Sequence, residues 1–456
     1  DRHHRIMQFE LTKKYIEDLK EAIVRNDEIA LIDLLQDLHP ADLGEVLGEL
    51  DVEESTVVYK VLDADRASDV LTHMEEDRRD KFLASLSSKE IAEQLIDNLD
   101  SDDAADMLNL FSQEQKEEII SLLEDRQQAE DIVDLLHYEE GTAGSLMAKE
   151  LIKVNINWTV SNSVKEMRKQ AEAIEHVYTV YVVDDDGCLV GRLPIKRLLL
   201  TPLKTRIADI YDSKIRSVGV DEDQEEIASM MEKYDLVALP VVDELGRLQG
   251  RITIDDVVDV IREEAERDYA LASGISGDVD SSDTVYRLTR ARLPWLLIGL
   301  IGGVMGARVI ELYEGDLQLY PEMAFFIPLI AAMGGNAGVQ SSAIIVQGLA
   351  NKSMGMSGIL PKLGKEFMVG LLNGIVCAAL IFVYNLAFGD SLDLSYTVSI
   401  ALLSVIIIAT LFGTFVPLLL DRYDIDPALA TGPFITTVND VFGLFVYFMI
   451  GHLLYI

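Results

Sequence analysis

Five long runs of apolar residues occupy the C-terminal part of the chain. They cover about residues 293–313, 323–349, 366–388, 395–420 and 427–455. Each run has the length of roughly 20 residues that a helix needs to cross the hydrocarbon layer of a membrane. The pattern therefore predicts an α-helical membrane domain of five spans over residues 292–456.

The pattern before these runs is one of short amphipathic helices and then of strands. Over residues 1–138, apolar helical stretches of about ten residues alternate with Asp, Ser or Pro, and similar segments begin at Pro40, Ala64 and Ser88, 24 residues apart. This period is typical of helical hairpins stacked as a small solenoid. We expect an acidic, all-α helical-repeat domain here.

Residues 139–262 contain two β-rich runs, 180–184 and 239–243, in one register. Gly187 and Arg192 have their counterparts 59 residues later in Gly246 and Arg251. Helices are expected before each strand pair, at about 161–175 and 221–234, and again after it. Two such α/β modules in tandem resemble a pair of CBS domains, which sense nucleotides or other ligands in the cytosol.

In CBS domains a Gly-x-x-Ser/Thr-x-x-Asp turn holds an adenosine ribose. The second repeat has this turn as Gly250, Thr253 and Asp256, whereas the first has Pro194 and Arg197 in the later places. The resemblance implies at most one ordinary ribose pocket, with Thr253 and Asp256 binding the cofactor. A CBS pair that binds no nucleotide remains the alternative.

Charge separates the two halves of the sequence. The chain has 39 Lys and Arg against 78 Asp and Glu, a net charge of −39, of which −33 lies before residue 276. Such acidity argues against a nucleic-acid partner, because phosphates require a basic surface. Two distant cysteines support neither a disulfide framework nor a zinc site. The motifs of ATPases, zinc proteases and serine hydrolases are absent from the sequence, and we expect no enzyme.

Charged residues around the apolar runs predict the orientation of the membrane domain. Basic residues precede the first run and lie between the second and third, and acidic residues follow the first: Arg287, Arg290, Arg292, Lys362 and Lys365 against Glu311, Glu314, Asp316 and Glu322. Basic loops mark the cytoplasmic side. We expect a multi-pass protein of the cell inner (plasma) membrane, with its N-terminal domains in the cytoplasm and its C-terminus outside.

Asp440 lies deep inside the last apolar run. It follows Pro427 by 13 residues, roughly 20 Å along a helix. No basic residue lies at comparable depth in another run, and an unpaired carboxylate within a membrane is by default an ion or proton site. A protonated, hydrogen-bonded Asp is the alternative.

The second run contains Gly334, Gly335 and Asn336, followed by Gln340 and two serines. Adjacent glycines loosen a helix, and amides at this depth are tolerated in protein or beside a wet cavity. We therefore expect this segment to line a cavity. Oxygen ligands without Cys favour a hard cation, and Mg²⁺ fits because it keeps its waters and needs few carboxylates. Ca²⁺, K⁺ and Na⁺ remain open on this argument.

The order of these parts, together with Gly-Gly-Asn-x-Gly-x-Gln-Ser and Pro-x-x-x-Thr-x-x-Asp, resembles the bacterial MgtE-type magnesium transporters. The resemblance implies a homodimeric, Mg²⁺-selective channel that cytosolic Mg²⁺ gates, with its pore on the dimer axis. It assigns ion selection to Asp440, the pore lining to Asn336 and the cytoplasmic mouth to Asp426.

The resemblance also assigns regulatory carboxylates to the CBS pair and to a linking (plug) helix and linker, residues 263–291. They are Asp223, Glu225, Asp235, Asp256, Asp259, Glu264 and Asp268. Like charges packed between domains repel, so a compact arrangement needs divalent cations. In the helical-repeat domain, Asp100, Asp102, Asp103 and Asp106 form the densest cluster, without individual assignments.

Two other functions stay open at this point. One is a broader divalent cation transporter that also carries Co²⁺, Mn²⁺ or Ca²⁺. The other is a nucleotide sensor that its spans merely tether to the lipid membrane. ATP, where bound, is expected to be a regulatory ligand, because no Walker-A loop is present in the sequence to use it as fuel.

Overall fold

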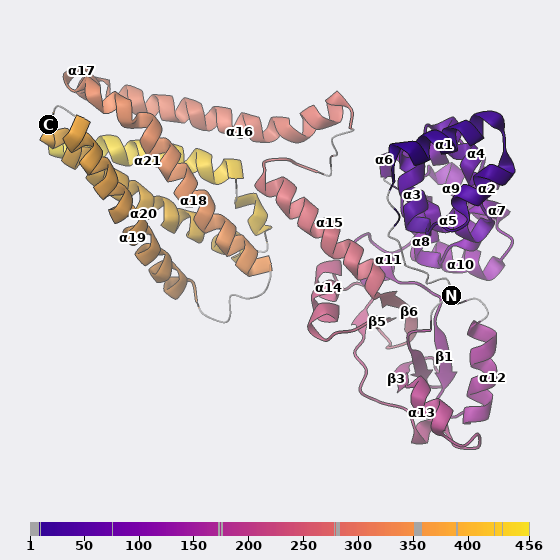
Figure 1. The fold of residues 1–456 in the computed structure, drawn as a ribbon. Coiled ribbons are helices and arrows are strands. Elements are labelled where there is room, and N and C mark those ends of the chain that lie inside the picture. Colours follow the sequence, from indigo (N-terminus) through magenta and orange to yellow (C-terminus); the bar gives the residue numbers. More distant parts are fainter. Residues whose placement is uncertain are drawn as a thin grey trace, which may run out of the picture. The chain divides into compact units, whose positions relative to one another are not determined.

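The computed structural model describes residues 9, 11–74, 76–171, 174, 177–277, 279, 283–350, 358–388, 391–423, 425–430 and 432–455. The chain divides into two compact units, Asp1–Arg262 and Glu263–Ile456. The first holds short helices and two small sheets, and the second holds long apolar helices (Figure 1). The predicted fold class, with an all-α part, an α/β part and a helical membrane part, is confirmed.

Short helices build the N-terminal part of the first unit. They are α1 (Lys13–Arg25), α2 (Glu28–Leu35), α3 (Pro40–Gly48), α4 (Val52–Tyr59), α5 (Ala64–Thr72), α6 (Glu76–Leu83), α7 (Ser88–Gln94), η1 (Ile96–Asn98), α8 (Ser101–Asn109), α9 (Gln113–Leu122) and α10 (Arg126–Leu135). Helices α3, α5 and α7 begin 24 residues apart, as the sequence pattern predicts. Asp63 and Ser87 cap α5 and α7 by accepting backbone N–H groups, which explains why a polar residue begins each repeat.

The two α/β modules follow. The first has α11 (Ala143–Leu146), β1 (Ile152–Asn155), α12 (Val160–Gln170), β2 (Val180–Val183), β3 (Leu189–Leu193), α13 (Ile195–Leu200) and η3 (Ile207–Asp209); the second has β4 (Val218–Gly219), α14 (Gln224–Lys233), β5 (Ala238–Val242), β6 (Leu248–Thr253) and α15 (Ile254–Ala272). In each sheet the first two strands are parallel and the last two antiparallel. The expected helices are therefore present, with slightly different ends.

The two modules repeat each other in backbone detail. Gly187 and Gly246, 59 residues apart, turn each hairpin with φ values of +83° and +80°, which glycine adopts without strain. The segment before each module joins the other module: Ala148 pairs with Arg251 of β6, and Asp212 pairs with Arg192 of β3. This exchange of segments fastens the modules together.

The second unit is a bundle of helices. It contains α16 (Val285–Leu312), α17 (Glu314–Leu319), η4 (Pro321–Phe326), α18 (Ile327–Ala350), α19 (Ile359–Phe388), α20 (Leu392–Arg422), η5 (Pro427–Ala430) and α21 (Gly432–Tyr455). Five helical segments among the described residues are long and apolar enough to cross a membrane. The third begins at Ile359, earlier than the apolar run predicted, so that Lys362 and Lys365 lie within the helix.

Helix α20 is the centre of this bundle, since α18, α19 and α21 all pack against it. Glycines permit the closest approach. A Cβ on Gly413 of α20 would lie 2.3 Å from the carbonyl oxygen of Gly338 on α18, which is less than any real contact. Small residues therefore bring the backbones together here, as is common between membrane helices.

Candidate cation sites

Asp440 lies on α21, eight residues after the helix begins, and its side chain is partly exposed in the single chain. No Lys, Arg or His of the described residues forms an ion pair with it. Gly335 of α18 leaves room beside the carboxylate, because a Cβ there would lie 3.4 Å from Asp440 Oδ1. The glycine pair predicted to loosen α18 thus lies next to the predicted carboxylate.

The other polar groups predicted near Asp440 have different surroundings. Asn439 is 3% exposed, packs against Gly338, and its Nδ2 finds no acceptor among the described residues. The Thr436 hydroxyl donates to backbone carbonyls one turn back, and the Thr437 methyl packs where Gly302 of α16 leaves space. Thr437 therefore contributes to helix packing. Of these polar groups, the Asp440 carboxylate is the candidate ligand for a cation.

Amide side chains follow one exposed stripe of α18. Asn336 and Gln340 are one turn apart, Gln347 follows two turns later, and all three are exposed in the single chain. Because lipid cannot satisfy amide groups, such a stripe requires water or protein. Together with the partly exposed Asp440 on the adjacent α21, it forms a polar face on an otherwise apolar bundle.

The predicted mouth residue, Asp426, lies near predicted regulatory residues of α15. The pKa of Asp268 is raised by burial first, and then by the negative charges of Asp426 and Glu264. Asp426 also caps η5, where its Oδ1 accepts from the N–H of Ala428 at 2.8 Å. Two carboxylates of α15, four residues apart, thus lie near a third from a distant part of the sequence, Asp426, within the second unit.

The first unit contains a second acidic site, between the helical repeats and the second α/β module. Asp100, Asp102 and Glu150 offer carboxylate oxygens that all lie within 4.8 Å of one another. Ser101 fixes Glu150, since its N–H and hydroxyl donate to the carboxylate at 3.2 and 2.8 Å. Oxygen-only ligands of this kind suit a hard divalent cation.

Asp256 belongs to the same site. Burial raises the pKa of Asp102 well above its usual range, and the nearby charge of Asp256 adds to this. Burial also raises the pKa of Asp256 to about 6, against hydrogen bonds from the N–H and hydroxyl of Thr253 at 3.0 and 2.8 Å. Asp256 and Thr253, which the sequence predicts to hold a ribose, are thus hydrogen-bonded to each other beside an acidic cluster.

The remaining predicted regulatory residues lie elsewhere on the exposed surface. Asp223 caps α14 by accepting from the N–H of Glu225 at 2.8 Å, and Asp235 ends that helix with a φ of +50°. Asp259 pairs with Arg262 at 3.1 Å on the exposed face of α15. The charge of Asp259, one turn along α15, still adds to the raised pKa of Asp256, and the regulatory role of all these residues stays a prediction.

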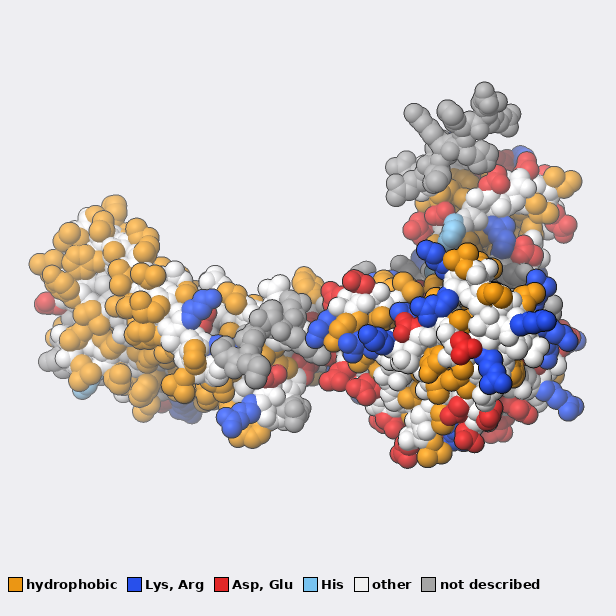
Figure 2. All heavy atoms as spheres, turned by 90° about the horizontal axis from the view of Figure 1, so that it is seen from below, with side chains coloured by type: hydrophobic (Ala, Val, Ile, Leu, Met, Phe, Trp, Pro, Cys, Tyr) orange, Lys and Arg blue, Asp and Glu red, His pale blue; other side chains and the backbone are white. Residues whose placement is uncertain are grey.

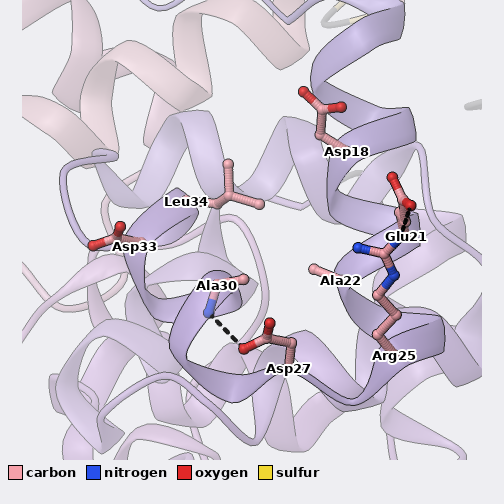
Figure 3. A pocket seen from close by; sticks show the side chains of 8 residues that line it. All are labelled: Asp18, Glu21, Ala22, Arg25, Asp27, Ala30, Asp33 and Leu34. Carbon is pink, nitrogen blue, oxygen red and sulfur yellow. Dashed lines mark hydrogen bonds and ion pairs between the residues drawn. The ribbon is translucent and has the colours of Figure 1, made fainter.

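Two cavities were not anticipated. One, of about 370 Å³, lies between α1 and α2 and is lined by acidic groups, of which Glu21 pairs with Arg25 and Asp27 caps α2 (Figure 3). The other, of about 220 Å³, lies between the α/β modules and includes the basic residues Arg192, Lys214 and Arg216. The buried hydroxyl of Tyr181 faces this cavity without a partner among the described residues.

Sequence reasoning also missed two carboxylates, the half-buried Glu150 and the buried Glu366. Glu150 follows Asp102 by 48 residues, and no spacing rule connects them. Glu366 is 8% exposed in α19, where it accepts a hydrogen bond from the Ser341 hydroxyl at 3.1 Å. Glu366 was overlooked because it lies at the edge of an apolar run. A predicted helix that began at Ile359, as α19 does, would have placed Glu366 inside the bundle.

Comparisons with known families agree with this architecture. The model of a divalent cation transporter family, MgtE, matches residues 327–450. The MgtE intracellular N domain matches residues 38–141, and the CBS domain matches residues 143–202 and 207–263.

Individual relatives extend the match over nearly the whole chain. The magnesium transporter MgtE of Thermus thermophilus is 34% identical over 97% of this chain and 99% of its own length, and that of Enterococcus faecalis is 37% identical over 70% of each chain. The solved cytosolic domain of the Mg²⁺ channel MgtE in complex with ATP is 36% identical, with a TM-score of 0.50 over 54% of this chain and 99% of its own. The chain belongs to the MgtE family of magnesium transporters.

Proposed function

We propose that this protein conducts Mg²⁺ across the membrane and that Asp440 selects the ion. The observation that carries the proposal is a partly exposed intramembrane carboxylate that has no basic partner among the described residues. Such a group is costly unless it meets a cation or a proton. Mg²⁺ releases its waters reluctantly, and a carboxylate can hold it through them. A broader divalent transporter remains the competing function.

The proposed channel is a homodimer with its pore on the two-fold axis. One subunit alone would expose Asp440, Asn336 and Gln340 to lipid, which cannot solvate them. A second subunit would close a wet path between the two polar faces and bring a second carboxylate to the same ion. Asn336 would line this path and Asp426 would stand at its cytoplasmic mouth.

We propose the cytoplasmic side for the first unit and the outside for the C-terminus. The N-terminal end of α16, which follows the first unit in the sequence, contains Arg287, Arg290 and Arg292. Acidic residues follow the C-terminal end of α16. Five crossings then place the C-terminus opposite the first unit. The proposed domains end at residues 138, 262 and 291.

Cytosolic Mg²⁺ is proposed to close the channel. Asp100, Asp102, Glu150 and Asp256 repel one another in the first unit, and Asp268 and Asp426 do so in the second. A divalent cation bound at each site would stabilise the compact arrangement. Loss of the cation would let the carboxylates separate and the arrangement open. Helix α15 begins in the first unit and ends in the second, so it is the proposed link between sensing and gating.

ATP is proposed as a regulatory ligand of the α/β modules. The cavity between them combines three basic side chains with the ring of Tyr234, on which Arg216 stacks at 3.5 Å. The phosphates of ATP could pair with the basic side chains, and its adenine base could stack on the aromatic ring. This cavity does not include Thr253 or Asp256, so the proposed nucleotide site differs from the one that the sequence predicts.

Asp440→Asn tests the selectivity proposal. The amide keeps the shape but removes the charge, so we expect Mg²⁺ uptake into proteoliposomes to fall at least about tenfold while the protein stays folded and oligomeric. Asp393→Asn, which neutralises an exposed carboxylate at the start of α20, is the matched control and should leave uptake unchanged. Full uptake by Asp440→Asn would contradict the proposal and favour a tethered sensor.

Asp102→Asn combined with Asp268→Asn tests the gating proposal. Removing one charge from each acidic site weakens cation binding, so we expect current to persist at cytosolic Mg²⁺ concentrations that close the wild-type channel in patch recordings. Asp37→Asn, an exposed carboxylate of the helical repeats, should close normally. Unchanged closure of the double variant would count against these sites.

The raised pKa values of Asp102 and Asp256 predict how stability depends on pH. A carboxyl whose pKa is raised in the folded state stabilises that state at low pH, and this contribution is lost as pH rises through its folded pKa, about 6 for Asp256. Without divalent cations, the melting temperature should therefore fall between pH 5 and pH 8, by less in Asp102→Asn. Mg²⁺ should raise the melting temperature more at pH 8 than at pH 5. An equal increase at both pH values would contradict a cation site at Asp102 and Asp256.

A further inference from the structure

Glu366 is an acidic residue in the interior of the membrane part. Hydrophobic side chains cover most of the visible face of the second unit, at the left of Figure 2, whereas Glu366 is only 8% exposed. None of the ion pairs among the described residues includes it. Because a buried carboxylate without a basic partner lowers stability, its presence points to a role other than filling space.

The hydrogen-bond partner of Glu366 is Ser341 of α18, whose hydroxyl donates to the carboxylate at 3.1 Å. The next residue, Ser342, donates to the carbonyl oxygen of Ala430 at 2.7 Å. Both serines are buried. Ala430 ends η5, the short helix that Asp426 caps. One serine thus attaches α18 to α19, and the other attaches it to the segment that carries the proposed cytoplasmic mouth.

These two hydroxyls differ from others in the membrane part. Those of Ser399, Ser404 and Thr410 donate to carbonyl oxygens one turn back in their own helix. Such a local bond is open to any Ser or Thr within a helix. Ser341 and Ser342 donate to other elements instead. Because adjacent residues project roughly 100° apart around a helix, the two bonds point in different directions and together fix the rotation of α18 about its axis.

The rotation of α18 decides where its amide stripe points. Asn336 and Gln340 lie on the exposed side of the helix, away from the buried Ser342. We propose that Glu366 is a positioning residue of the permeation path: by accepting from Ser341 it holds α18 in the rotation at which the two amides face the path. An ionised acceptor makes a stronger hydrogen bond than a neutral one. The inference rests on the proposed channel and adds a residue that acts at a distance from the ion.

Two substitutions of Glu366 separate the hydrogen bond from the charge. Glu366→Gln keeps an oxygen that can accept from Ser341, and Glu366→Leu removes it. The full-length protein is reconstituted in planar bilayers, and reversal potentials give the permeability of Mg²⁺ relative to Na⁺. We expect Glu366→Leu to lower this ratio several-fold, because the amides of α18 no longer meet the hydrated ion in a fixed orientation. Glu366→Gln should remain close to the wild type.

Ser341→Ala tests the same hydrogen bond from the donor side. It removes a single oxygen, so it provides the test even where Glu366→Leu does not fold. We expect a similar fall in the permeability ratio, and no further fall when the two substitutions are combined, since both remove one interaction. Ser404→Ala is the matched control, because that hydroxyl bonds within its own helix, and it should leave the ratio unchanged.

Two results would overturn the inference. A wild-type permeability ratio in folded Ser341→Ala and Glu366→Leu, even with a lower melting temperature, would show that the hydrogen bond only stabilises the bundle. A Glu366→Gln channel as unselective as Glu366→Leu would show that the charge acts and the hydrogen bond does not. Neither result affects the proposed function, which Asp440→Asn tests separately. Absence of Mg²⁺ current in the wild type would instead refute the proposed channel itself.

Discussion

The membrane part of this molecule depends on one constraint, a negative charge that no described basic residue neutralises, held within an apolar helical bundle. Asp440 has no basic partner among the described residues, and α18 gives it room through Gly335. The cost of such a carboxylate is consistent with the amides on α18 beside it, and with the proposed second subunit that would keep this polar face in contact with water. The proposed selection of a hydrated cation rests on the same geometry.

In the first unit, carboxylates act on one another rather than alone. We propose that the lone carboxylate of the membrane part attracts a passing ion, whereas the several carboxylates of the first unit repel one another unless an ion binds between them. Burial is the main cause of the raised pKa values of Asp102 and Asp256, and the neighbouring negative charges add to it. The proposed transport site and the proposed sensing site therefore use the same kind of ligand, a carboxylate. They differ in the number of carboxylates that lie close together.

Local patterns predicted most of the fold, and non-local contacts account for what they missed. The 24-residue helical period, the 59-residue repeat and the five apolar runs each depend on neighbours in sequence, and all three appear in the structure. Glu150 and the cavity around Tyr181 arise where segments far apart in sequence meet, so no spacing could indicate them. Asp440 was predictable because its depth within one helix is itself a local property.

Anomalous diffraction from crystals of the full-length protein grown with Mn²⁺ would test the central claim most directly. We expect an anomalous peak on the two-fold axis between two Asp440 carboxylates, at distances that leave room for coordinated water, and the loss of this peak in Asp440→Asn. A peak-free axis, with Asp440 turned toward lipid or paired with a basic group of the partner subunit, would contradict it.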